Sequence, residues 1–288
     1  GFPVNWTGDM GVETEGSIAD AMRLNLELRT GLHVLFELRH FPCHDPEELY
    51  KTSLRIPWER IIDPSGYVCV TSSVEHRTIN NTNYANLKLK DAIVDRITRQ
   101  TGRRPDSGPD RGHVVIHLIW RGDLARIYVN TSGHKLSDRG YRKIPHKAPM
   151  KETLAAAVLR AMGYSGQCPV LTPMCGSGTL AIEAALIAQN RAPGLLRSNY
   201  GFMHVKGFDP KFWQELRRET LKRGKRPIQH PIIATDHDAE AIEAARKNAL
   251  TAGVDHLIDF RVCDFDKTTV PELTGMIVLP PASVDRRG

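Results

Sequence analysis

The stretch that most constrains the fold of this chain is residues 171–179, Leu-Thr-Pro-Met-Cys-Gly-Ser-Gly-Thr. An apolar run over residues 169–171 leads into it, and a helical pattern over residues 180–189 follows it. Glycines let a backbone turn tightly beneath a ligand because no Cβ is in the way, and the free N–H groups of the next helix then face that ligand. The stretch therefore predicts a strand, a glycine turn and a helix start that together hold a ligand.

The residues beside the two glycines limit which ligand this turn can hold. A nucleotide-binding P-loop carries a lysine directly after its second glycine, and here Thr179 stands in that place. A ligand with hydroxyl groups and a carboxylate but no phosphate, such as S-adenosylmethionine (SAM), fits this turn better than ATP does. A Gly-x-Gly string is also typical of an ordinary turn, so the interpretation depends on the rest of the chain.

The residues after the turn alternate between strand and helix patterns, which predicts a parallel sheet. Strands are expected over residues 231–235, 258–262 and 275–279, with a helix over residues 239–252. Ligands bind at the carboxyl edge of the strands in open α/β sheets. Polar or proline residues follow each predicted strand there, so we expect the site at that edge.

Two aspartates stand at this predicted edge. Asp236 follows the second strand, where a carboxylate accepts ribose hydroxyls, and Asp264 follows the third, where it accepts from an adenine amino group. The alternatives are a helix cap for Asp236 and a turn residue for Asp264. The ribose-binding acid ordinarily lies about 20 residues after the glycines. Asp236 lies much further along, which predicts an insertion over residues 191–230.

Two residues within and after the turn have more than one interpretation. Glu183 lies among alanines and leucines of the following helix, where it either supports the turn from below or is a charge at the helix edge. Cys175 has no evident base partner in the sequence, so a small thiol that fills the turn is favoured over a nucleophile.

The first half of the chain has the pattern of a different α/β module, over residues 46–130. A strand is expected over residues 67–74 and an amphipathic helix over residues 87–101. Residues 113–120 and 124–129 form a predicted hairpin. Residues 131–150 hold several glycines and prolines, so the boundary between two domains is expected there.

Charge and composition indicate the class of partner. The chain of 288 residues has a net charge of +6, with basic clusters over residues 134–151 and 217–226. Either cluster alone is typical of a solvated face, but the two together beside a cofactor turn favour nucleic acid. The five cysteines and twelve histidines lack the spacing of metal ligands, so we expect no metal and reduced thiols in a cytoplasmic protein. No apolar run is long enough to span a membrane, so no membrane partner is expected.

Several separate motifs, in the same order along nearly the whole chain, resemble the bacterial ribosomal RNA guanine-N2 methyltransferases that act on the large subunit. They are residues 173–185 and 192–195 in the second half, and residues 90–95, 102–105, 132–133, 139–142 and 148–152 upstream. The resemblance implies an α/β protein whose partial, Rossmann-like class I methyltransferase domain follows a THUMP or ferredoxin-like RNA-binding region. The implied domains are 1–45 (a partial N-terminal ferredoxin-like segment), 46–133 (THUMP), 134–150 (a basic linker) and 151–288 (methyltransferase, without its C-terminal strands).

The resemblance also implies roles for individual residues. SAM is the implied cofactor, and large-subunit ribosomal RNA the implied partner and methyl acceptor. The implied cofactor-binding residues are Pro173, Cys175, Gly176, Ser177, Gly178, Thr179, Glu183, Asp236, His237, Asp264 and Phe265. The implied RNA-binding residues are Lys88, Lys90, Arg103, Arg104, Lys135, Arg139, Arg142 and Lys143.

The sequence departs from the family pattern in places that bear on catalysis. Thr172 stands where the family keeps an aspartate. The family's Asn-Pro-Pro-Tyr acceptor motif aligns with Leu279, Pro280, Pro281 and Ala282, or, shifted by one, with Pro280 in the place of the Asn. Neither alignment supplies an amide to bind the target amino group. The chain also begins inside the family's N-terminal domain and ends at Gly288, before the last strands of a methyltransferase sheet, so we expect a fragment or a divergent relative. Three hypotheses follow: a guanine-N2 methyltransferase, an RNA-binding protein with a degenerate methyltransferase fold, and a DNA amino-methyltransferase, which the THUMP-like half disfavours. The sequence does not indicate an oligomeric state.

Overall fold

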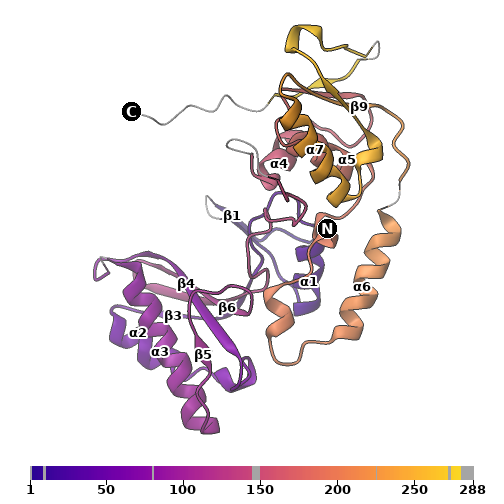
Figure 1. Cartoon of the computed structure of the whole chain (residues 1–288). Coiled ribbons are helices and arrows are strands. Elements are labelled where there is room, and N and C mark those ends of the chain that lie inside the picture. The colour runs from indigo at the N-terminus through magenta and orange to yellow at the C-terminus, as the bar shows by residue number, and fades with distance from the viewer. Residues whose placement is uncertain are drawn as a thin grey trace. The chain divides into compact units, whose positions relative to one another are not determined.

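The computed structural model describes residues 2–8, 11–79, 81–144, 150–224, 226–271 and 274–279. The chain forms two compact units (Figure 1). Unit 1 comprises residues 1–25, 33–135 and 199–213, and unit 2 comprises residues 26–32, 136–198 and 214–288. Residues 26–32 and 199–213 thus belong to the unit opposite to the one that their place in the sequence indicated.

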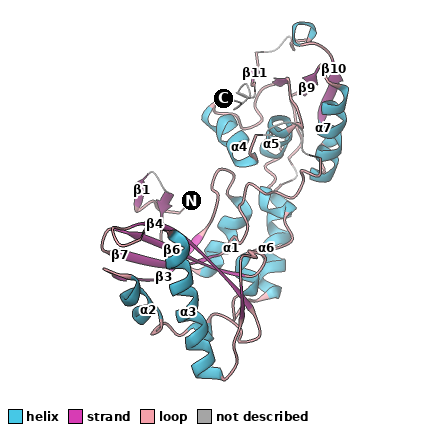
Figure 2. Cartoon of the chain, turned by 60° about the vertical axis from the view of Figure 1, so that its left-hand side comes forward, coloured by secondary structure: helices cyan, strands magenta, loops and turns pink. Residues whose placement is uncertain are grey.

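Unit 1 is built on a five-stranded sheet with the order β3-β7-β6-β4-β5. The strands are β3 (Leu35–Pro42), β4 (Tyr67–Glu75), β5 (Asp106–Ser107), β6 (Val114–Arg121) and β7 (Leu124–Asn130). The helices α2 (Pro46–Ser53) and α3 (Thr82–Thr101) lie together beside this sheet (Figure 2). Trp58 and Trp120 are fully buried in its core. The predicted hairpin is confirmed, because β6 and β7 pair antiparallel around Gly122, whose φ is 49°.

The N-terminal part of the chain adds smaller elements. The strands β1 (Trp6–Gly8) and β2 (Gly11–Glu13) pair antiparallel, and the helix α1 (Ile18–Glu27) follows them. The helix α3 begins five residues before the predicted start at Leu87. Its first three residues are exposed, so apolar spacing did not reveal them, and the side chain of Asn81 caps the helix by accepting from Asn83 N.

Unit 2 contains a four-stranded parallel sheet with the order β10-β9-β8-β11. This confirms the parallel sheet predicted for the second half of the chain. The strands are β8 (Val170–Pro173), β9 (Ile232–Asp236), β10 (Ile258–Val262) and β11 (Met276–Ile277). The helices are α4 (Glu152–Ala161), α5 (Thr179–Ala188), α6 (Pro210–Arg223) and α7 (Ala239–Ala252), and residues 210–213 at the start of α6 belong to unit 1. Every residue of α5 is buried, as its nearly continuous apolar sequence requires.

Five single turns of 3₁₀-helix complete the described elements. They are η1 (Trp58–Arg60), η2 (Pro193–Leu196), η3 (Gly201–His204), η4 (Asp255–Leu257) and η5 (Phe265–Lys267). Within the described residues, no helix is both long and apolar enough to cross a membrane. The same residues contain no group of three or more His, Cys, Asp or Glu side chains that could hold a metal ion.

Candidate functional site

The glycine turn between β8 and α5 has the backbone that its sequence predicted. Met174, Gly176 and Gly178 have φ values of 51°, 54° and 80°, in the left-handed region that favours glycine. A Cβ on Gly178 would lie 2.9 Å from the Cβ of Ala245 in α7, so this glycine permits close helix packing. A Cβ on Gly176 would meet nothing within 4 Å, so the space above this residue is open to a ligand.

Asp236, the last residue of β9, fixes this turn. Its Oδ2 accepts a hydrogen bond from Gly176 N at 2.9 Å, and its Oδ1 accepts from Asp238 N at 3.1 Å. Asp238 caps α7, because its own Oδ1 accepts from Glu240 N at 2.9 Å. The helix-cap alternative for Asp236 is therefore wrong. Its carboxylate instead ties the end of β9 to the turn after β8.

Asn248 in α7 holds the turn from below. This side chain is fully buried, and its Oδ1 accepts from Lys143 N at 2.9 Å and Ile144 N at 3.1 Å. Its Nδ2 donates to Ile144 O at 3.0 Å and to Ser177 O at 3.2 Å. This residue was not predicted from the sequence. The available signal was an amide at the helical spacing of the buried alanines of α7.

Arg139 corrects one prediction. Its side chain is 1% exposed, so its guanidinium cannot reach RNA phosphates as predicted. Its Nε donates to Glu183 Oε1 at 3.5 Å, and its Nη1 and Nη2 donate to Leu136 O at 2.9 Å and Arg29 O at 2.5 Å. A buried guanidinium is retained only where carboxylate and carbonyl oxygens surround it, as they do here.

Glu183 lies in the core, 0% exposed, and so it does not face a ligand directly. Its Oε1 also accepts from Tyr141 OH at 3.2 Å. Burial raises the pKa of Glu183, and the guanidinium groups of Arg139 and Arg29 oppose that shift. The implied direct contact of Glu183 with the cofactor is therefore wrong. Glu183 instead supports the turn from within the core, which is one of the two interpretations of this residue.

Arg142 is also turned inward, which weakens the prediction that it contacts RNA. Its side chain is 17% exposed and lies 3.1 Å from Glu152 Oε1. Its Nη2 donates to Met150 O at 2.6 Å and to Thr179 Oγ1 at 3.0 Å, at the first residue of α5. It therefore links the segment before α4 to the glycine turn.

The other predicted RNA-binding residues have cationic groups nearer the surface. Lys88 and Lys90 are partly exposed and lie 3.6 Å from Glu47 and 3.0 Å from Asp91, respectively. Arg103, Arg104, Lys135 and Lys143 are exposed. Lys143 belongs to unit 2 and the other five to unit 1. Their role in RNA binding stays a prediction.

The carboxyl ends of β10 and β11 contribute a more open part of the same sheet edge. Asp264 has a side chain 63% exposed, Phe265 is 57% exposed and the side chain of His237, after β9, is 75% exposed. Leu279, after β11, is 44% exposed, and Pro280 and Pro281 lie outside the described residues. Parallel pairing thus brings the glycine turn, Asp236, His237 and the β10 end to one edge.

Three residues beside the turn lie inside the sheet or its margin. Thr172 is 0% exposed, and its Oγ1 donates to Ile233 O at 3.3 Å, so the residue in place of the family aspartate faces the interior. Pro173, the last residue of β8, is also buried. Burial raises the pKa of Cys175 to about 12, which leaves its thiol protonated and fits a filling role rather than a nucleophile.

Comparisons with known proteins divide the chain into two domains, in the order that the sequence predicted. A THUMP domain model matches residues 43–130, and a model described as RMKL-like, methyltransferase domain matches residues 139–281. The ribosomal RNA large subunit methyltransferase K/L of Psychromonas ingrahamii is 38% identical over 284 residues, 96% of this chain. Its Vibrio cholerae counterpart is 36% identical over 86% of this chain. The chain spans 38% and 36% of these relatives.

Solved structures share the fold. A predicted N6-adenine-specific DNA methylase from Listeria monocytogenes has a TM-score of 0.83 and 30% identity, covering 93% of this chain and 72% of that one. SMU.472, solved in complex with SAH, has a TM-score of 0.83 and 28% identity, covering 96% of this chain and 73% of that one. The predicted order, a THUMP domain followed by a class I methyltransferase domain, is confirmed.

Proposed function

Because the chain belongs to the family that joins a THUMP domain to an RMKL-like methyltransferase domain, we propose that it is a SAM-dependent RNA methyltransferase. Its proposed acceptor is the exocyclic N2 amino group of a guanine in large-subunit ribosomal RNA. The observation that carries the proposal is the hydrogen bond from Gly176 N to Asp236 Oδ2 at 2.9 Å. It joins a glycine turn and a carboxylate at the edge where an open α/β sheet binds ligands.

The residues at this edge fit SAM. The open space over Gly176 and the N–H groups that start α5 suit the methionine end, and Asp236 is the proposed acceptor for the ribose hydroxyls. Asp264 and Phe265 offer an exposed carboxylate and an exposed ring to the adenine. SAM supplies an electrophilic methyl group, and the chain binds and orients the two reacting molecules.

The exposed cations of unit 1 support RNA as the substrate. Arg103 and Arg104 are exposed, and their guanidinium groups make no hydrogen bond or ion pair within the described residues. Contacts of this type to phosphates give affinity and strong salt dependence rather than base choice. The names of the curated relatives support the large-subunit RNA as the particular substrate.

A specific observation favours a second candidate function, RNA binding without efficient transfer. Leu279 follows β11 where the family keeps an asparagine, and an aliphatic side chain can neither accept from nor donate to a guanine amino group. Methyl transfer depends on positioning and on preorganised polar groups, so this replacement should lower the rate. Under this second candidate function, the chain binds RNA and its methyltransferase fold is degenerate.

Calorimetric titration of SAM into the chain, followed by a methyl-transfer assay on unmodified large-subunit RNA, tests both candidates. Saturable SAM binding and methylated guanine in the RNA are the expected results. Binding without transfer would support the second candidate, and absence of SAM binding would reject both the site and the enzymatic function. A DNA duplex of the same sequence is the control substrate, and equal affinity for it would reject RNA as the preferred partner.

A further inference from the structure

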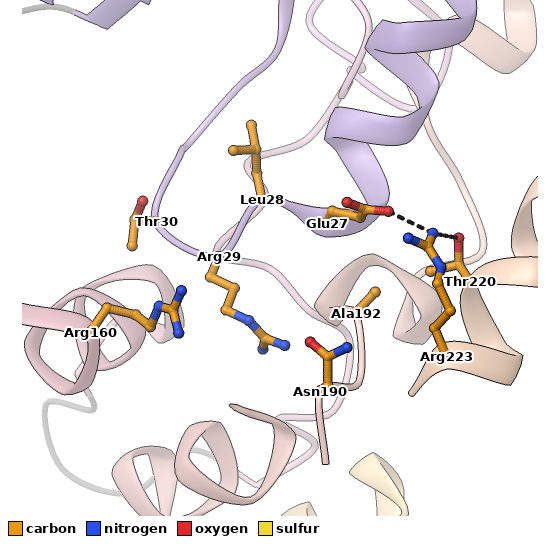
Figure 3. A pocket seen from close by; sticks show the side chains of 9 residues that line it. All are labelled: Glu27, Leu28, Arg29, Thr30, Arg160, Asn190, Ala192, Thr220 and Arg223. Carbon is orange, nitrogen blue, oxygen red and sulfur yellow. Dashed lines mark hydrogen bonds and ion pairs between the residues drawn. The ribbon is translucent and has the colours of Figure 1, made fainter. Parts of the chain in front are cut away.

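A pocket of about 430 Å³ lies within unit 2, and none of its lining residues belongs to the glycine turn or the sheet edge (Figure 3). Four helices contribute to it at or near their C-terminal ends. Its lining residues are Glu27, Leu28, Arg29, Thr30, Arg160, Asn190, Ala192, Thr220 and Arg223. Three arginines and one glutamate make it predominantly basic.

One of the three arginines is neutralised by that glutamate. Arg223 Nη2 lies 2.8 Å from Glu27 Oε1 and also donates to Thr220 Oγ1 at 3.3 Å. Arg160 is exposed, and in the part of the chain that the structure describes it has no carboxylate partner within ion-pair distance. The residues that line the pocket therefore do not neutralise the positive charges of Arg160 and Arg29.

Arg29 has a buried donor without an acceptor. Its Nη2 donates to Arg191 O at 2.9 Å and Leu186 O at 3.3 Å. Its Nη1 is buried and has no hydrogen-bond partner among the residues that the structure describes. Such an unmet buried donor destabilises the fold, and more so when the group is charged. Figure 3 shows the Arg29 side chain reaching into the space between Arg160 and Asn190.

The buried charges around Arg29 do not balance. Glu183 is the carboxylate that acts on Arg29, and it is already bonded to Arg139. Burial, together with the nearby Arg139 and Arg160, lowers the pKa of Arg29 to about 10, so the group is still protonated at neutral pH. Two buried carboxylates, Glu183 and Glu152, thus face the three guanidinium groups of Arg29, Arg139 and Arg142, which leaves an excess positive charge beside the pocket.

The helix C-termini around the pocket account for Arg29 Nη2, which donates to Leu186 O in the last turn of α5, but not for Arg29 Nη1 or Arg160. Their partial negative charge attracts cations, which is the ordinary reason for arginines at such positions. However, the terminal carbonyls already have donors from the chain: Val158 O accepts from Met162 N at 3.0 Å, and Leu221 O accepts from Gly224 N at 3.3 Å. No bond from these carbonyls reaches Arg29 Nη1 or Arg160 in the described part of the chain.

We propose that this pocket binds a phosphate group, with Arg29 and Arg160 as its charged ligands and the Asn190 amide as a neutral one. Guanidinium groups bind phosphate through strong, charge-assisted hydrogen bonds. Phosphate oxygens point in four directions, which suits donors that converge from separate helices better than a planar carboxylate does. The phosphate comes either from an RNA backbone, which rests on the proposed function, or from a free phosphate compound.

The test measures binding of inorganic phosphate and of a short single-stranded RNA to the full chain and to Arg160→Gln. The matched control is Arg218→Gln, which removes the same charge from α6, where the side chain is 62% exposed and outside the pocket. We expect Arg160→Gln to weaken phosphate binding roughly tenfold, and the control to leave it unchanged. Arg29→Gln should weaken it more, provided that thermal melting shows the variant to be folded.

The two ligands separate the two sources. If Arg160→Gln weakens RNA binding and millimolar phosphate displaces RNA from the wild type, the pocket takes an RNA phosphate. If only phosphate binding weakens, the ligand is a free phosphate compound. If Arg160→Gln and Arg218→Gln have the same effect on both ligands, the proposal is overturned.

A SAM titration of the same variants keeps this proposal apart from the proposed function. Arg160 does not belong to the glycine turn or the sheet edge, so SAM affinity should not change. If the chain binds phosphate through Arg160 but does not bind SAM, the proposed function is rejected and the phosphate-binding pocket is supported.

Discussion

The two units place their charged side chains differently. Among the described residues, the Arg, Asp and Glu side chains that are buried, namely Arg139, Glu152, Glu183, Arg197 and Asp236, all belong to unit 2. In unit 1 the ion pairs lie nearer the surface, as with Arg96 and Glu59, whose side chains are 26% and 20% exposed. The core of unit 1 is instead filled by apolar side chains such as Trp58 and Trp120.

This difference separates two uses of charge. Buried charges cost free energy unless they are paired, so a fold retains them where they fix the position of other groups. In unit 2, Asp236 bonds directly to the glycine turn, and Glu183 and Arg139 support the helix that follows it. The exposed guanidinium groups of Arg103 and Arg104 in unit 1 make no hydrogen bond or ion pair within the described residues and can meet a polyanionic partner.

The largest effect should come from Glu183→Ala, which leaves Arg139 and Arg29 buried without their carboxylate. We expect the free energy of unfolding of unit 2 to fall by about 3–5 kcal/mol. Far-UV circular dichroism follows both units during urea unfolding, whereas all four tryptophans, Trp6, Trp58, Trp120 and Trp213, belong to unit 1. Tryptophan fluorescence therefore serves as an internal control.

The matched control for this prediction is Glu243→Ala, on an exposed part of α7 where the side chain is 66% exposed. It should change stability by less than about 0.5 kcal/mol. If Glu183→Ala is no more destabilising than Glu243→Ala, the buried charge of Glu183 does not fix the position of other groups in unit 2.

Asp236→Ala should have the next largest effect, on cofactor binding. It removes the tie to Gly176 N and the proposed bonds to two ribose hydroxyls, so SAM affinity should fall at least tenfold, and by up to about 3 kcal/mol. The control is Asp238→Ala, which removes the cap of α7 and should cost about 1 kcal/mol of stability. Calorimetry that finds the same loss of SAM affinity in both variants would contradict the role of Asp236.

Lowering the pH should destabilise unit 1 through His117, a titratable side chain that is partly buried. Burial lowers the pKa of His117 to about 4, and its ring Nδ1 lies 2.8 Å from Thr71 Oγ1. The ordinary pKa is about 6.5, so between these values the unfolded chain binds the proton and the folded chain does not. Stability is therefore complete above about pH 6.5 and falls as the pH drops toward 4, by at most about 3 kcal/mol because water partly reaches the ring.

Urea unfolding followed by tryptophan fluorescence at several pH values measures this loss in unit 1. His117→Gln should flatten the dependence, because glutamine retains a hydrogen bond to Thr71 but does not titrate. His113→Gln, at a histidine whose side chain is 47% exposed, should leave it unchanged. A wild-type profile without a slope between pH 6.5 and 4 would rule out His117 as the source.

Features set by local sequence were predictable from the chain alone. The glycine turn, the parallel strands and the β6–β7 hairpin follow from periodicity and turn residues within short windows. Asp236 could be placed because a strand end defines its position. The helix α6 was not predicted, because its charged residues had been interpreted only as a basic cluster within an insertion.

Features set by distant partners were not predictable. Arg139 lies in a run of basic residues, which indicates a surface, and its carboxylate partner is 44 residues further along the chain. Asn248 bonds to residues 105 and 71 positions away. Residues 199–213 join unit 1 through contacts such as Phe202 N to Thr131 O at 3.0 Å. A single sequence shows the residue types in such pairs but not that they meet.

The smallest expected effect concerns the exposed cations of unit 1. Changing Arg103 and Arg104 together to glutamine should weaken RNA binding several-fold and reduce the slope of log affinity against log salt by about one to two. The folding stability should stay within about 0.5 kcal/mol, because both side chains are exposed. The control is the pair Arg39→Gln and Arg121→Gln, which removes the same charge from other exposed positions of unit 1. If both pairs reduce the slope equally, the RNA responds to net charge alone, and unit 1 has no particular RNA-binding surface at residues 103–104.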